Sequence, residues 1–129
     1  AYRSSIDMEV SQKIETLFIK GKKEFLDGRY YDAHETWEDL WSDYYLKDRK
    51  FVQGLIQLSV SFVHLKNNNM IGAKSLLKKS KAKFSDFEGV HRSISMNKLK
   101  NEMNKVEKVY QLLNNIENFD WSLVPKLEK

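Results

Sequence analysis

The stretch FVQGLIQLSVSFVHL, residues 51–65, contains no Asp, Glu, Lys or Arg and carries apolar side chains around most of a helix. A helix at the surface of a globular protein has one apolar and one charged face, so this segment is typical of the buried centre of a bundle. It is also shorter than the roughly 20 apolar residues that a membrane span needs. The sequence therefore predicts a central helix over 49–66 and no membrane span.

Apolar side chains at helical spacing predict four further helices around this one, over 8–27, 30–45, 70–84 and 93–117. Turn residues at 27–29, three Asn at 67–69 and a loop over 85–92 separate them. The tail after residue 117 is apolar enough to dock back onto the helices. We expect an all-α fold, a single-domain helical bundle of about five helices that spans residues 1–129.

A faint internal repeat runs through the first four predicted helices at a constant offset of 40 residues. Its two copies are the sets Phe25, Gly28, Ala33, Trp37 and Leu65, Asn68, Ala73, Leu77. Each copy has the small residue that a close helix–turn–helix corner needs, as in tetratricopeptide (TPR) repeats. Two copies do not make a solenoid, so we expect two TPR-like helical hairpins.

Composition limits the class of protein further. The 129 residues are 41% hydrophobic and include no Cys, which excludes disulfide scaffolds, zinc fingers and iron–sulfur clusters. The net charge of +4 is modest, and the lysines over 74–83 have no aromatic residues between them, which argues against a nucleic-acid partner. No export signal pattern is visible, so a cytoplasmic location is expected, or the stroma if the chain is encoded in a plastid.

Polar side chains gather on the second and third predicted helices. His34 and Glu38 are four residues apart and share a face, so they can contact a common ion or substrate. On the central helix, Gln53, Gln57 and His64 follow at intervals of four and seven. Burying such groups without partners costs about 1–3 kcal/mol, so we expect the two sets to face each other.

The result is a predicted polar pocket between the second and third helices, walled by Trp41 and Tyr45. A structural network is the other interpretation: His34 would then simply pair with Glu38, and Gln57 would bridge backbone carbonyls. The sequence leaves both open. A zincin motif is absent, because residue 38 is Glu where that motif requires His.

The motif His34-x-x-x-Glu38-x-x-Trp41 resembles the hallmark of a bacterial, archaeal and plastid family of helical proteins known as a domain of unknown function. The block over 51–57, followed by His64, Asn69 and Gly72, resembles the second conserved block of that family. The resemblance covers about residues 20–84, leaving out the helix over 93–117 and the tail. It implies an all-α bundle and a metal-binding role for the motif, and it supplies no reaction.

Two functions follow as hypotheses. In the first, His34, Glu38 and His64 bind a divalent transition metal ion (zinc, manganese or iron), while Gln53, Gln57 and Trp41 orient water or shield the site. In the second, the chain is a non-enzymatic interaction module for a protein partner, and the polar stripe is structural. A small-molecule ligand and a homodimer are further options, and whether the chain is an enzyme stays open.

Overall fold

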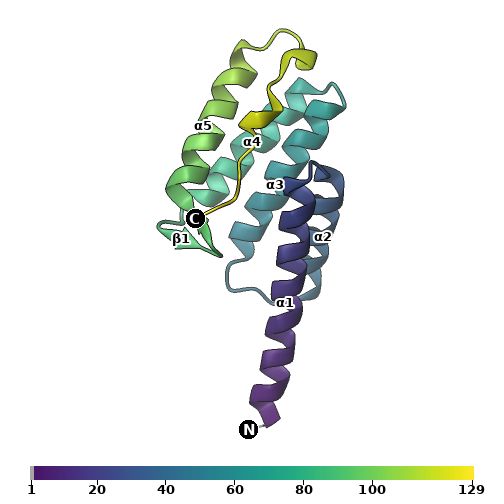
Figure 1. The fold of residues 1–129 in the computed structure, drawn as a ribbon, viewed down its shortest axis with the longest axis vertical. Coiled ribbons are helices and arrows are strands. Elements are labelled where there is room, and N and C mark those ends of the chain that lie inside the picture. The colour runs from purple at the N-terminus through teal and green to yellow at the C-terminus, as the bar shows by residue number, and fades with distance from the viewer. Residues whose placement is uncertain (1) are drawn as a thin grey trace.

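The computed structural model of the chain describes residues 2–129 and the side chains of residues 5–129. Within these limits five helices lie side by side (Figure 1): α1 (Tyr2–Leu26), α2 (Tyr30–Asp43), α3 (Arg49–Lys66), α4 (Met70–Phe84) and α5 (Met96–Leu112). A short antiparallel hairpin of β1 (Val90–His91) and β2 (Ile94–Ser95) precedes α5. Two 3-10 helices, η1 (Ile116–Asn118) and η2 (Trp121–Leu123), follow it. The predicted all-α bundle is confirmed.

Helix α3 forms the centre of this bundle, since it packs against α2 on one side and α4 on the other. Its apolar residues are withdrawn from solvent, with Phe51, Val52, Leu55, Leu58 and Phe62 fully buried. The lack of charge over 51–65 therefore reflects a helix covered by neighbours along most of its circumference.

The α1–α2 and α3–α4 corners have the same local structure. Gly28 and Asn68 both adopt a left-handed backbone conformation, with φ of 80° and 60°. The amide of Arg29 donates to the carbonyl of Glu24 at 2.9 Å, and Asn69, 40 residues further on, donates to His64 at 2.8 Å. Glycine and asparagine are the residues that tolerate this conformation best, so each corner follows from its local sequence.

Helix α5 is shorter than the predicted span of 93–117. At its start, Ile94 and Ser95 pair with β1, and the Ser95 hydroxyl accepts a hydrogen bond from the Lys98 amide as the helix cap. At its end, Leu113 is extended, and Asn115 caps η1 instead of continuing the helix. Asn and Ser favour such capping over helix interiors. The second helix likewise ends at Asp43 rather than at 45, and α1 begins before residue 8.

The tail returns along the bundle and packs against it. Phe119, Val124 and Leu127 are buried, and the Phe119 ring lies 5.9 Å from the ring of Tyr110 in α5. The carbonyl of Glu128 accepts a hydrogen bond from the Ser95 amide at 2.8 Å, which ties the tail to β2.

Within the described residues, no helix is both long enough and apolar enough to cross a membrane.

Candidate functional site

A pocket of about 130 Å³ opens between α2 and α3. Helix α2 contributes Glu38 and Trp41, which are three residues apart and so project from one side of the helix. Helix α3 contributes Gln53, Ile56 and Gln57. At about 30 Å³ per water molecule, this volume suits an ion with its water ligands or a very small polar molecule.

Gln57 gives the pocket an unusual hydrogen-bonding requirement. Its side-chain oxygen Oε1 is buried and accepts no hydrogen bond from the residues that the structure describes. A buried acceptor without a donor costs about 1–3 kcal/mol, and native proteins rarely leave one unpaired. Gln57, which lines this pocket, therefore carries an oxygen that calls for a donor or a cation.

Trp41 forms a fixed wall. Its indole Nε1 donates to the Arg49 carbonyl at 3.2 Å, and the Arg49 guanidinium lies 3.9 Å from the centre of the indole ring. The hydrogen bond and the cation–π contact hold the ring in one orientation across the loop that joins α2 to α3. The predicted second wall, Tyr45, is 85% exposed and does not line the pocket.

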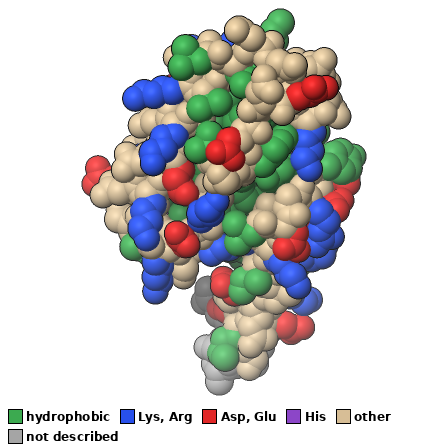
Figure 2. Space-filling view, turned by 45° about the horizontal axis from the view of Figure 1, so that its top comes forward, with side chains coloured by type: hydrophobic (Ala, Val, Ile, Leu, Met, Phe, Trp, Pro, Cys, Tyr) green, Lys and Arg blue, Asp and Glu red, His purple; other side chains and the backbone are tan. Residues whose placement is uncertain are grey.

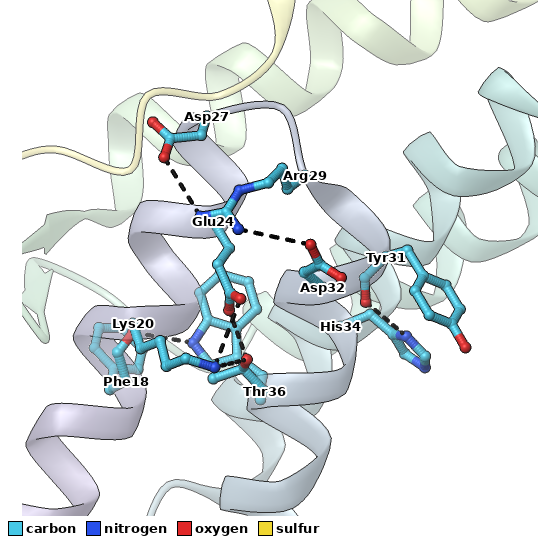
Figure 3. A network of polar contacts seen from close by, with 10 residues as sticks. Phe18, Lys20, Glu24, Asp27, Arg29, Tyr31, Asp32, His34 and Thr36 are labelled. Atoms are coloured by element: carbon cyan, nitrogen blue, oxygen red, sulfur yellow. Dashed lines mark hydrogen bonds and ion pairs between the residues drawn. The ribbon is translucent and has the colours of Figure 1, made fainter.

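His34 does not itself line the pocket, but it contacts Glu38, which does. Its Nε2 is 2.9 Å from Oε2 of Glu38, and its Nδ1 is 3.2 Å from the Tyr31 carbonyl. A carbonyl oxygen can only accept, so Nδ1 carries a proton. Figure 3 shows the imidazole next to Tyr31, apart from the polar contacts between α1 and α2.

His64 does not join His34 and Glu38. Its ring lies against α4 at Gly72, where an added Cβ would be only 2.8 Å from the ring. The Asn69 side chain accepts from the Gly72 amide through Oδ1, so its Nδ2 donates to Nδ1 of His64 at 3.3 Å. Among the described residues, His, Asp and Glu form no group of three or more that could hold a metal ion. The predicted trio of ligands is therefore not brought together.

A polar cluster that the sequence did not reveal joins the α2–α3 loop to the β-hairpin. Asp48 accepts from Nε2 of His91 at 2.7 Å and from Nε and Nη2 of Arg92 at 2.5 and 3.0 Å. Burial raises the pKa of Asp48, but the hydrogen bonds and charges of Arg92 and His91 outweigh it, so the pKa lies below its ordinary value. Residues more than 40 positions apart meet here, which no local pattern could indicate.

A second such contact lies between α1 and α2. Thr36 of α2 is buried and donates to Oε1 of Glu24 at 2.5 Å. Figure 3 shows Lys20 beside the same carboxylate, with its ammonium 3.7 Å from Oε2. The buried charge is thus neutralised within the bundle, as a structural contact.

One of the lysines on α4 is paired with an acidic residue of the neighbouring helix. Lys81 donates to Glu107 of α5 at 2.8 Å. On the face shown in Figure 2, Lys and Arg side chains stand among Asp and Glu. A nucleic-acid interface usually presents a basic stripe, so this arrangement offers no such surface on that face.

The comparisons with known proteins find one family over part of the chain. No curated protein matches the chain. Residues 18–76 match a family described as "Domain of unknown function (DUF309)", and this segment runs from the second half of α1 into α4. All five residues that line the α2–α3 pocket lie within the match. Over residues 18–76 the chain is thus similar to a domain-of-unknown-function family, whose description names no activity.

Proposed function

We propose that the chain binds a divalent metal ion in the α2–α3 pocket, with Nε2 of His34, the carboxylate of Glu38 and Oε1 of Gln57 as its protein ligands. The observation that carries this proposal is the buried, unpaired Oε1 of Gln57, a residue that lines the same pocket as Glu38. A cation would satisfy both oxygens at once.

The state of His34 supports the proposal. Histidines that bind metals usually donate their second ring N–H to a carbonyl or carboxylate, which fixes the tautomer and aims the other nitrogen at the ion. Here Nδ1 makes this contact with the Tyr31 carbonyl, and Nε2 points to Glu38. An imidazole and a carboxylate beside one another are thus available without rearrangement of the helix.

The donor set favours particular metals. Imidazole nitrogen suits zinc and iron, whereas carboxylate and amide oxygens suit manganese. A mixed set of one nitrogen and two oxygens therefore fits manganese, iron or zinc, with water completing the coordination. Gln53 would hold such a water, and Trp41 would shield one side of the ion. His64 is outside this ligand set, because Asn69 already occupies its Nδ1.

The test measures metal binding directly. Protein purified without an affinity tag is stripped with chelator, dialysed, and titrated with manganese, ferrous iron and zinc by calorimetry and thermal denaturation. We expect one ion to bind per chain and to raise the melting temperature. His34→Ala and Glu38→Gln should abolish binding, whereas His64→Ala should retain it and serves as the matched histidine control.

The proposal is wrong if none of the three metals binds, or if His34→Ala binds as tightly as the parent. Loss of binding in His64→Ala as well as in His34→Ala and Glu38→Gln would instead favour the ligand set predicted from sequence.

A second function, as an interaction module, is favoured by a separate observation. The start of α1 and the loop that joins α2 to α3 lie toward the same end of the molecule (Figure 1), and both expose large apolar side chains, among them Ile6, Met8 and Tyr45. Such residues contribute most to protein interfaces when a partner covers them. The exposed side chains at the start of α1 form a pattern that indicates which kind of partner would bind there.

A further inference from the structure

The first part of α1 extends beyond the rest of the bundle (Figure 1). Every described side chain from residue 5 to residue 13 is exposed, and burial begins only at Ile14. An isolated helix of this length is marginal in water, because most helix stability comes from packing of an apolar face. The exposed segment therefore lacks, within the described chain, the packing that the rest of α1 has.

This segment nevertheless carries an apolar stripe. At 100° per residue, Ile6, Val10, Ile14 and Leu17 fall within about 80° of one another on the helix. Ile6 is 54% exposed and Val10 is 41% exposed, while Ile14 and Leu17 are partly covered by the bundle. In Figure 2 the protruding end shows hydrophobic side chains among charged ones. The face that packs α1 onto the bundle thus continues into solvent.

We propose that a second copy of this chain covers the stripe, with the two α1 helices antiparallel and related by a two-fold axis at Val10. The spacing is symmetric about that residue, since Ile6 and Ile14 lie four positions to either side. Each Ile6 would then pack on the partner's Ile14, and the two Val10 side chains would meet. A two-fold interface requires such self-complementarity.

The charges along the stripe agree with the same pairing. Glu9 and Lys13 border one edge of the stripe, 3.8 Å apart, with both side chains largely exposed. A two-fold axis across antiparallel helices brings this edge of one chain against the same edge of the other, in the opposite direction. Helical side chains lean toward the N-terminus of their own helix. Each Glu9 would therefore lean toward the partner's Lys13 and away from the partner's Glu9, which gives two favourable pairs.

Other occupants fit less well. A helix that lies on an anionic membrane carries Lys and Arg on its polar face, whereas residues 5–13 contain Asp7, Glu9 and one Lys.

The stripe offers fewer residues than the 20–30 that each partner contributes to a stable complex. We therefore expect a weak dimer that forms with rising concentration.

The first experiment is a charge exchange followed by sedimentation equilibrium. Glu9→Lys and Lys13→Glu each place like charges across the interface and should weaken dimerisation about tenfold. An equimolar mixture of the two variants should restore it, because the two Lys of one chain then meet the two Glu of the other. If the substitutions acted only through the Glu9–Lys13 pair within each chain, mixing the two variants would not restore the dimer. A mixture that fails to dimerise would therefore contradict the proposed pairing.

The second experiment introduces a cysteine into a chain that has none. Val10→Cys should form a disulfide-linked dimer under mild oxidation. Met8→Cys is the matched control, since Met8 is 62% exposed on the opposite side of the same helix and should remain unlinked.

Three results would overturn the proposal. The first is equal crosslinking of the Val10→Cys and Met8→Cys variants, and the second is a parent protein that stays monomeric at millimolar concentration. The third is a monomeric Val10→Cys variant whose introduced thiol resists alkylation, because the chain's own segments would then cover the stripe.

Discussion

Replacing Gln57 by Met tests whether the buried oxygen in the α2–α3 pocket has a ligand. Methionine has nearly the same length and shape but no acceptor, so the substitution removes the unpaired Oε1 without leaving a cavity. Relief of a buried unpaired acceptor is worth about 1–2 kcal/mol. In a chain of this size each kcal/mol shifts the melting temperature by about 4 °C. In chelator, Gln57→Met should therefore melt about 4–8 °C above the parent.

Added metal should reverse this order. A ligand at 100 times its dissociation constant stabilises the folded state by about 2.7 kcal/mol, which corresponds to about 11 °C for the parent. The variant has lost one ligand and should gain far less. The same pair of proteins should thus exchange rank between chelator and metal.

The control is Gln53→Met in the same pocket. Within the described part of the chain, no buried unpaired atom is found on Gln53, so this change should give no gain in chelator. The reasoning is refuted if Gln57→Met is less stable than the parent in chelator, because Oε1 would then have a partner in solution. It is also refuted if Gln57→Met and the parent gain equally from metal.

Three further substitutions test the packing around the site, each measured by urea unfolding. Thr36→Val removes the hydroxyl that donates to the buried Glu24 carboxylate and should cost about 1–3 kcal/mol. Gly54→Ala would place a Cβ 2.9 Å from an aromatic ring of α4 and should cost about 1–3 kcal/mol by overpacking. Asp48→Asn should lower stability at pH 7. Because the folded-state pKa of Asp48 is lowered, its contribution is present above the ordinary value of 3.8 and disappears as the pH falls below it. Parent and Asp48→Asn should therefore converge near about pH 2, and an equal gap at pH 7 and at this low pH would contradict the assignment.

Local signals were sufficient to predict most of the fold. The uncharged run over 51–65 predicted a central helix because burial on several sides excludes charge wherever it occurs. Gly28 and Asn68 predicted the two corners because each adopts a backbone conformation that few residues tolerate. The end of α5 was not predicted, since Leu113 and Ile116 continue the helical spacing while Asn115 between them caps a new turn.

The candidate site was predicted only in part, because helical spacing gives a face but not the direction in which a side chain leans. Gln57 and His64 fall on nearly the same side of α3, yet they are about 10 Å apart along its axis. Gly72 leaves a gap that the His64 ring fills, and Asn69 fixes the ring there. The Asp48 cluster depends on how the β-hairpin meets the α2–α3 loop, which only the tertiary structure determines.

The walls of the pocket are held by contacts that do not involve the proposed ligand. Trp41 is fixed by Arg49, and the loop between α2 and α3 is fixed by Asp48 and its partners on the hairpin. Glu38, with its side chain 57% exposed, is the proposed ligand with the most freedom. Binding an ion would therefore order one carboxylate instead of moving two helices, which keeps the conformational cost small. The α1 stripe shares no residue with this pocket, so Glu9→Lys should leave metal affinity unchanged and His34→Ala should leave the dimer intact.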